Sequence, residues 1–527
     1  MPELNVALAH LAVEHGQPEK NLAELLRLFH RAADEGARIA VGPEMSLSGY
    51  CFESREEIAP FAQEADGPAG TALGKLAGER GIYLVAAWAE RDPLTGIFYN
   101  SAFVFGPDGA LVKRYRKISA ESRWACPGPA AQNNVFDTPW GRMGLLICSD
   151  SYYALPSRVT AVKGADLIFV PANWPPGGLD PSDLWRQRAR ENGVYLLAAN
   201  RTGQERRMDC RAAKSCAAAP SGAALLDRAA DATALMWARL PLDEHGHLAG
   251  LRRRGILASR RREACYRAVG NFSVIENLTG FLKLPSPGRL NIHCLIPGAD
   301  ENPVDCLIHR RQDFDPVSLI VLPSRSYSAS EREGIGNFAE TGEIAVVARD
   351  GATGRLCFWT KGGERSGVWP SSGATADAAD LPRVEFGPAR ILLASLDELI
   401  HPELALAAAK WGCDLAVASE SRMDEGRAAL VALRPIEQIA VAACARDGAA
   451  IGLIPQGHEA GRGVRTFREG LCSCVLDTAE TRRKKFQERI DYEALFSWGP
   501  SRSGDFCKGA GHALGQVPED RFQKTAI

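Results

Sequence analysis

Residues 141–150 read GRMGLLICSD, an apolar run that ends at Cys148 and passes directly into Ser149 and Asp150. A short apolar run bounded by glycine and by polar residues predicts a buried strand. A cysteine at the end of such a strand has two interpretations. It is either a packed core thiol or a reactive group at the strand end, which is where the active sites of α/β proteins usually form. The rest of the sequence decides between them.

Composition limits the classes of protein to consider. The chain has 527 residues, of which 46% are hydrophobic and 24% charged, and its net charge is −2. This length predicts about two to four domains. The balanced charge argues against a nucleic-acid partner, and no apolar run approaches the roughly 20 residues that span a bilayer. The N-terminal residues lack the basic start and apolar stretch of a secretory signal, so we expect a cytoplasmic protein without membrane contact.

The cysteines fit that compartment. There are fourteen, scattered along the chain, with no C-x-x-C pair and no Cys/His spacing of the zinc type. We therefore expect free thiols in a reducing compartment and no metal site.

Strands and helices alternate along the first half of the chain, which predicts an α/β fold. The predicted strands cover residues 4–11, 38–41, 82–90, 101–117 (a hairpin), 142–148, 166–174 and 194–200, and the predicted helices cover residues 18–36, 71–81, 154–165 and 184–193. Three polar or reactive residues stand at or just beyond the ends of predicted strands: Glu44, Lys117 and Cys148.

The second half of the chain repeats segments of the first in the same order. The matches are LNVALAHL with LNIHCLIP, RIAVGPEMSLSGY with SLIVLPSRSY, GRMGLLICSD with PARILLASLD, and ARLPLDE with SCVLDTAE. Four matches in one order predict two copies of one fold. We place the first domain at residues 1–283, the second at 284–500 and a C-terminal tail at 501–527.

The repeat also bears on Cys148. In the second copy Ser324 stands where the first has Glu44, and Ser395 stands where the first has Cys148. Lys361 is a weaker match for Lys117. Loss of a carboxylate and a thiol together indicates that the second copy is catalytically inactive.

Glu, Lys and Cys together suit acyl transfer through a thioester. A carboxylate can take the proton of a thiol and return it to a leaving nitrogen. A lysine ammonium and the backbone N–H of Ser149, directly after the cysteine, can hold the oxyanion that forms when a carbonyl is attacked. This chemistry needs no cofactor.

These residues lie in motifs that resemble the nitrilase superfamily of carbon–nitrogen hydrolases. GPEMSLSGY is similar to its glutamate motif, KRYRKIS to its lysine motif and GRMGLLICSD to its cysteine motif. The resemblance implies an αββα sandwich, here in two tandem copies, with Glu44 as general base, Lys117 as oxyanion donor and Cys148 as nucleophile. It also implies a second glutamate, Glu121 of ESRWACPG, although only three residues separate it from Lys117.

The resemblance bears on the substrate as well. Nitrilases of the family usually carry C-W-E at the cysteine, whereas amidases and carbamoylases carry C-x-D, as in Cys148-Ser149-Asp150. The expected substrate is therefore a small amide or N-carbamoyl compound. Nitrile hydrolysis and a non-catalytic binding or scaffold role remain the alternatives. Three aromatic residues near the motifs are candidates for the substrate pocket, with ordinary packing as the alternative reading: Trp124, Tyr152 and Trp174.

The two copies raise the question of assembly. Family members often place two sandwiches side by side, so a tandem chain is expected to form an intrachain pseudo-dimer. Further homo-oligomers remain open, and the alternative is two independent domains on one chain.

Overall fold

The computed structural model describes residues 2–206, 208–259, 269, 277–298, 300–367, 382–455, 465–467, 470–487 and 489–497. The predicted tail at 501–527 lies outside these residues. Within them, no helix has the length and apolarity that crossing a membrane requires.

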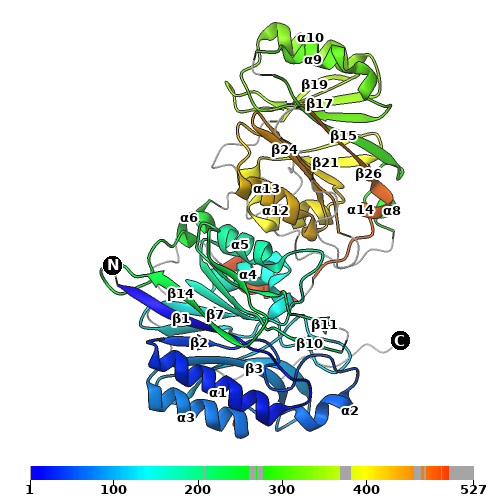
Figure 1. Ribbon diagram of the computed structural model, residues 1–527. Coiled ribbons are helices and arrows are strands. Elements are labelled where there is room, and N and C mark those ends of the chain that lie inside the picture. The colour runs from blue at the N-terminus through cyan, green and yellow to red at the C-terminus, as the bar shows by residue number, and fades with distance from the viewer. Residues whose placement is uncertain are drawn as a thin grey trace, which may run out of the picture.

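The first half of the chain forms two facing six-stranded sheets (Figure 1). The first sheet has the order β14 (Ala234–Pro241), β1 (Glu3–His10), β2 (Ile39–Val41), β3 (Tyr83–Arg91), β4 (Phe98–Phe105) and β5 (Leu111–Arg116). The second has the order β13 (Ala224–Ala229), β12 (Lys214–Ala218), β9 (Tyr195–Ala199), β8 (Leu167–Pro171), β7 (Gly141–Leu145) and β6 (Val135–Thr138). Side chains from both sheets form one buried core between them.

Helices cover the outer faces of these sheets. The first sheet carries α1 (Pro18–Asp34) and α3 (Pro68–Arg80), and the second carries α4 (Ala154–Val162) and α5 (Pro181–Asn192). Their sequences explain why they pack there. In α1, Leu25, Leu28, Phe29 and Ala32 fall on one face at a spacing of three or four residues, and all are buried. The first half is thus an αββα sandwich.

The second half repeats this arrangement strand for strand. One sheet has the order β26 (Gly470–Asp477), β15 (Arg289–Ile296), β16 (Ser318–Val321), β17 (Ile344–Arg349), β18 (Leu356–Thr360) and β19 (Gly363–Gly367). The other has the order β25 (Arg465–Phe467), β24 (Gly448–Gly452), β23 (Ala440–Ala445), β22 (Leu415–Ser419), β21 (Ala389–Leu393) and β20 (Arg383–Phe386). Outer helices include α9 (Pro303–His309), α10 (Ala329–Glu340), α12 (Pro402–Lys410) and α13 (Glu425–Leu433). The chain therefore contains two αββα sandwiches, as predicted.

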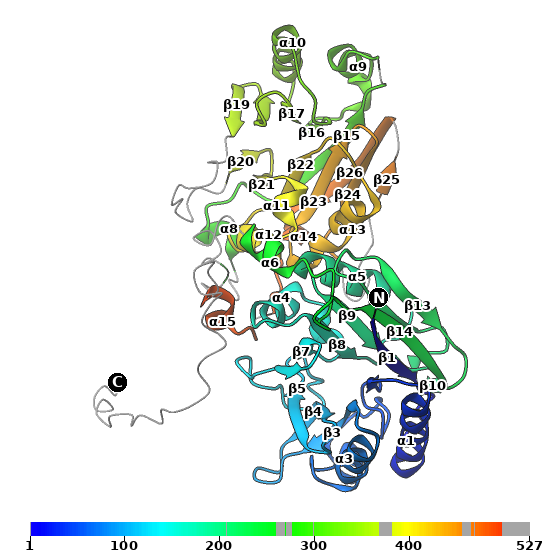
Figure 2. The same ribbon diagram turned by 90° about the vertical axis from the view of Figure 1, so that its left-hand side faces the viewer.

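The two sandwiches meet through equivalent helices. In both views α4 and α5 lie beside α12 and α13 (Figures 1 and 2). Charged side chains are buried where they meet. Arg434, just after α13, donates to Glu191 of α5 at 2.8 Å, and Arg158 of α4 lies 3.4 Å from Glu403 of α12. All four residues are at most 1% exposed. Removing one partner of such a pair leaves a buried charge without compensation, at a typical cost of about 3–5 kcal/mol.

Candidate active site

Cys148 lies in a sharp turn directly after the strand that GRMGLLICSD predicted. β7 ends at Leu145, and a short 3-10 turn runs over Cys148–Ser151. The φ angle of Cys148 is +46°, in the left-handed region that costs an ordinary L-residue about 1–2 kcal/mol. The hydroxyl of Ser151 donates to the carbonyl of Cys148 at 2.6 Å and helps to hold this conformation. The turn presents a thiol that is 6% exposed.

Asp150 ties this turn to the lysine segment. Its carboxylate is fully buried and accepts hydrogen bonds from the Tyr115 hydroxyl and from the backbone N–H of Ser119, both at 2.8 Å. It also accepts from the N–H of Ile147 at 3.3 Å. In the sequence, Asp150 indicates only the substrate class. In the structure, its hydrogen bonds also fix the position of Cys148 relative to the loop that follows β5.

Lys117 lies just past the end of β5 and is fully buried. Its ammonium donates to Oε1 of Glu44 at 2.7 Å and to Oε1 of Glu121 at 2.5 Å. The short Lys117–Glu121 spacing, which departs from expectation, thus places both side chains in direct contact. Two carboxylates around one ammonium leave this cluster with an excess of negative charge.

The second oxygen of Glu44, Oε2, is buried and has no hydrogen-bond partner among the described residues. The Glu44 carboxylate interacts with the thiol of Cys148. Glu44, Lys117, Glu121 and Cys148, named separately from the sequence, are therefore neighbours in space.

The environment separates the pKa values of these groups. Burial raises the pKa of Glu44 above its usual range, although the Lys117 charge opposes this. Burial raises the pKa of the Cys148 thiol as well, and the Glu44 charge adds to the effect. For Glu121 burial acts upward, but the Lys117 charge and the hydrogen bonds from Lys117 and Tyr50 together outweigh it, and the pKa is lowered. The consequence is a neutral thiol at rest, beside a carboxylate with raised proton affinity.

Two further residues complete the cluster. The side-chain amide of Asn100 donates to Oε1 of Glu44 at 2.8 Å and to Oε2 of Glu121 at 3.2 Å. The hydroxyl of Tyr50 donates to Oε1 of Glu121. Sequence reasoning did not single out either residue, although Tyr50 ends GPEMSLSGY and Asn100 lies in YNSAFVFGPDG.

Cys148 opens into a cavity of about 1270 Å³ that is lined by both sandwiches. Ser149, Tyr152 and Trp174 line it from the first sandwich. The second sandwich adds Leu453, Ile454, Pro455, Val475 and Leu476, and the segment that follows it adds Arg483 and Lys485.

The third aromatic candidate lies elsewhere. Trp124 is fully buried and packs in a cluster with Met45, Phe52 and Ile58. It is not among the residues that line this cavity, and its position fits the packing alternative: the side chain fills the core beneath the glutamate motif.

Among the described residues, the second sandwich has no counterpart of the cluster of Glu44, Lys117 and Cys148. Strand register assigns Ser324 to the Glu44 position: the N–H of Glu44 donates to the carbonyl of Ala172 just after β8, and that of Ser324 donates to Glu420 just after β22. Glu420 fills this region, since its carboxylate accepts from the N–H of Leu396 at 2.7 Å.

The predicted match between Cys148 and Ser395 is wrong by one residue. Met143 pairs with Leu167 in the first sandwich, and Ile391 pairs with Leu415 in the second. Counting five residues onward from Met143 and Ile391 places Leu396, not Ser395, at the Cys148 position. The match of Lys361 with Lys117 is also wrong. Lys117 follows β5, whose equivalent in the second sandwich is β19, whereas Lys361 lies before β19, in the turn that follows β18.

Among the residues that the structure describes, no group of three or more His, Cys, Asp or Glu side chains is arranged to hold a metal ion. The polar cluster around Cys148 is thus built from one cation, two carboxylates, an amide and a phenol.

Comparison with known proteins adds an independent line of evidence. The family described as carbon-nitrogen hydrolase matches residues 5–249. A nitrilase of Pyrococcus abyssi is 36% identical over 211 residues, which cover 38% of this chain and 77% of that protein. An omega-amidase of Homo sapiens is 31% identical over 214 residues, which cover 38% of this chain and 75% of that protein. Among solved structures, Saccharomyces cerevisiae Nit3, a member of the nitrilase superfamily, matches 46% of this chain and 90% of its own, with 26% identity and a TM-score of 0.42.

Proposed function

Since the chain belongs to the carbon–nitrogen hydrolase family of the nitrilase superfamily, we propose that it is an amidase-type hydrolase. Its substrate would be a small amide or N-carbamoyl compound, cleaved through a thioester on Cys148 with release of ammonia or an amine. The observation that carries this proposal is the buried contact of Lys117 with Glu44 and Glu121, beside a thiol held in a strained turn that opens into a cavity.

The first half of the proposed reaction forms the thioester. Glu44 takes the proton of Cys148, and the thiolate sulfur bonds to the carbonyl carbon of the amide. The Lys117 ammonium and the N–H of Ser149 hold the resulting oxyanion; one such donor is typically worth about 10²–10³ in rate. The tetrahedral intermediate collapses when the C–N bond breaks, and Glu44 gives its proton to the departing nitrogen.

The second half releases the acid. Glu44 takes a proton from water, and the hydroxide oxygen bonds to the thioester carbon. The C–S bond then breaks, and Glu44 gives its proton to the departing sulfur, which regenerates the thiol. We assign Glu121 to two tasks. As a buried carboxylate of lowered pKa it keeps Lys117 charged, and through Tyr50 and Asn100 it keeps the ammonium near Glu44.

An amide is the first choice of substrate, and a nitrile is the second. The C-x-D pattern at Cys148 supports an amide or N-carbamoyl compound, while the similarity to a protein named nitrilase keeps nitriles open. Aromatic and aliphatic side chains line the cavity next to the thiol, so the substrate body is expected to be at least partly apolar.

The second sandwich would act by packing rather than by chemistry. The buried contacts of α4 and α5 with the second sandwich support an intrachain pseudo-dimer, with two sandwiches held together on one chain. Because both sandwiches lie on one chain, their association is intramolecular and does not depend on protein concentration.

Ammonia and amine release measured over a panel of amides, N-carbamoyl amines and nitriles tests the proposal. Turnover of amides or carbamoyl compounds above nitriles supports it, and turnover of nitriles alone makes the chain a nitrilase. If no compound is hydrolysed and Cys148 reacts with an alkylating agent no faster than other cysteines, the binding or scaffold role is the better account.

A further inference from the structure

We propose that Gln487, on the segment that follows the second sandwich, is a positioning residue for the reaction at Cys148. This segment, residues 482–487 and 489–497, is called the C-terminal strap below. The inference rests on the proposed function of Cys148 and adds that the strap completes the active site from outside the first sandwich.

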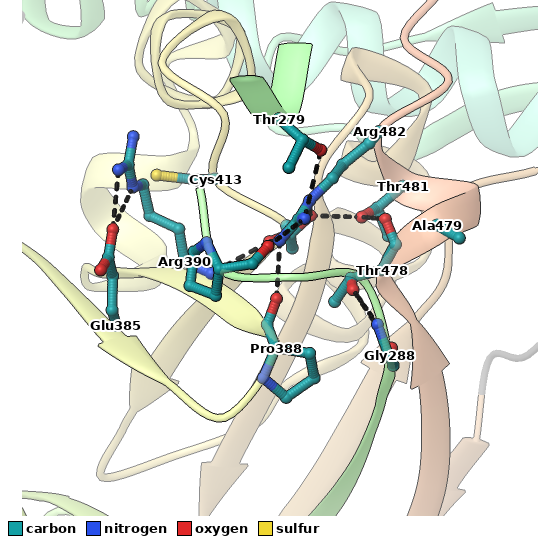
Figure 3. Close-up of polar contacts among 12 residues, drawn as sticks. Thr279, Gly288, Glu385, Pro388, Arg390, Cys413, Thr478, Ala479, Thr481 and Arg482 are labelled. Carbon is teal, nitrogen blue, oxygen red and sulfur yellow. Dashed lines mark hydrogen bonds and ion pairs between the residues drawn. The ribbon is translucent and has the colours of Figure 1, made fainter. Parts of the chain in front are cut away.

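The strap is fixed at its start by Arg482. The Arg482 guanidinium donates to the carbonyl of Pro388 at 2.6 Å (Figure 3). Arg482 donates to the carbonyl of Pro285 at 2.5 Å as well, and it lies 3.2 Å from a carboxylate oxygen of Asp414. It also donates to the hydroxyl of Thr279 at 3.3 Å. Arg482 thus joins the segment between the sandwiches to the second sandwich, and these contacts hold the start of the strap in place.

The next residues lead the strap toward the first sandwich. The ammonium of Lys484 is bound by two backbone carbonyls, those of Cys413 at 2.9 Å and Gln438 at 2.6 Å. Lys485 donates its backbone N–H to the side chain of Gln438 at 3.0 Å. These contacts fix the direction in which the chain reaches Gln487.

Beyond Gln487 the strap is attached to the first sandwich. Asp491 lies 2.7 Å from the ammonium of Lys163, just after α4. Ile490 and Leu495 are buried in one apolar cluster with Leu155 and Val159 of α4. The strap therefore has a fixed position on both sides of Gln487.

Gln487 itself reaches the loop between Lys117 and Glu121. Its Nε2 donates to the hydroxyl oxygen of Ser119 at 2.7 Å. The amide orientation is set from the other end, because Oε1 of Gln487 accepts from the backbone N–H of Arg489 at 2.9 Å. A carboxamide held at its oxygen presents its NH₂ group to Ser119.

Ser119 connects this contact to the nucleophile. Its backbone N–H donates to Asp150, and its carbonyl accepts from the hydroxyl of Ser149 at 3.2 Å. Ser119 is thus hydrogen-bonded to both residues that follow Cys148, and it comes two residues after Lys117 in the chain. A shift of this loop changes the distance between the ammonium and the thiol, and small misplacements of reacting groups have large effects on rate.

The experiment measures how fast iodoacetamide alkylates Cys148 in the full-length chain, with the partly exposed Cys126 as an internal reference in the same peptide digest. Gln487→Ala and Ser119→Ala are each expected to slow alkylation of Cys148 by about three- to tenfold, the effect of losing one hydrogen bond. The double variant should be no slower than the slower single variant, since both changes remove the same bond. Ser119→Thr, which keeps the hydroxyl, should restore most of the rate.

Arg489→Ala is the matched control, because it alters the exposed part of the strap but keeps the backbone N–H that orients Gln487. Its rate at Cys148 should equal the wild-type rate. If Gln487 only stabilised the fold, Gln487→Ala would loosen the fold and buried cysteines such as Cys413 would be alkylated faster. That change is opposite in direction to the slower alkylation of Cys148 that we expect.

Three results contradict the inference. One is a wild-type rate at Cys148 in Gln487→Ala. Another is additive losses in the double variant. In the third, Cys148 of the wild-type chain reacts no faster than Cys126, which contradicts the proposed function and this inference with it. Fast wild-type alkylation without an effect of the variants contradicts this inference alone.

Discussion

Nζ of Lys117 lies 2.7 Å from Oε1 of Glu44, and neither side chain has contact with solvent. Seventy-three positions separate the two residues in the chain. β2 and β5 lie in the same sheet, and the segments that follow them carry Glu44 and Lys117 to the turn of Cys148. The proposed chemistry depends on this contact, because the Lys117 ammonium has to lie next to the oxyanion and the Glu44 carboxylate next to the thiol of Cys148.

Glu44→Gln should remove the general base while keeping the shape of the side chain. We expect kcat to fall by about 10²–10⁴, the usual contribution of general acid–base catalysis. The fold should persist because Lys117 keeps Glu121 as a counter-ion. Ammonia release and the urea unfolding midpoint are the measurements.

The matched control for Glu44→Gln is Glu79→Gln, which changes a carboxylate on the surface of α3, paired with Lys75 at 3.7 Å. Its turnover should equal that of the wild type. Equal activity of the two variants would remove Glu44 from the mechanism.

The acid limb of the pH profile of kcat/KM should report the ionisation of Glu44. The carboxylate must be ionised to accept the thiol proton, and burial raises its pKa from the usual value of 4.5. Activity should therefore fall, as pH is lowered, with a midpoint above 4.5. Because Glu44 and Glu121 share Lys117, this limb reports an apparent pKa of the set.

Unfolding has to be excluded as the cause of that acid limb. Near-UV circular dichroism over the same pH range shows whether the fold persists. A limb at or below pH 4.5 in a folded protein would mean that burial does not tune this carboxylate.

Ser395→Ala should lower stability without affecting chemistry. The Ser395 hydroxyl oxygen caps α11 (Leu396–Leu399) by accepting from the N–H of Glu398 at 3.3 Å. Loss of such a cap costs about 1 kcal/mol of unfolding free energy. Chemical denaturation and ammonia release check both parts. Lost turnover in a folded variant would show that the second sandwich takes part in the reaction.

Residues 1–283 expressed alone test the pseudo-dimer. This fragment lacks Arg434, the partner of the buried Glu191, and exposes Leu155 and Val159, which pack against the second sandwich and the strap. We expect it to aggregate, to self-associate through the vacated face or to lose most activity. Light scattering on a sizing column, with ammonia release on the same fractions, is the measurement. A monomeric fragment with full turnover would instead support two independent domains.

Much of this architecture could be predicted because it depends on periodic patterns. Buried strands leave continuous apolar runs, so the sequence predicts the segments around β1, β2, β7 and β8 and their counterparts in the second copy, and this repeat predicts two sandwiches. Glu44, Lys117 and Cys148 stood out because polar groups at strand ends are conspicuous in sequence.

The missed features depend on contacts between distant segments. Matching the letters of the two strands sets Met143 against Arg390, whereas strand pairing sets it against Ile391, so the letters pair Cys148 with Ser395 in place of Leu396. Trp124 lies near the motifs in sequence but points into the core. Gln487 is one polar residue in a segment without periodicity, and it reaches Ser119 across 368 positions.

Ammonia release by Cys148→Ala is the most direct test of the central claim that this thiol carries the acyl group. The substituted side chain is small and buried, so its loss costs only about 1–2 kcal/mol of packing and the fold should persist. The account predicts no detectable turnover of any compound that the wild-type chain hydrolyses, at an unfolding midpoint close to that of the wild type. Turnover by the folded variant at a rate comparable to the wild type would contradict it.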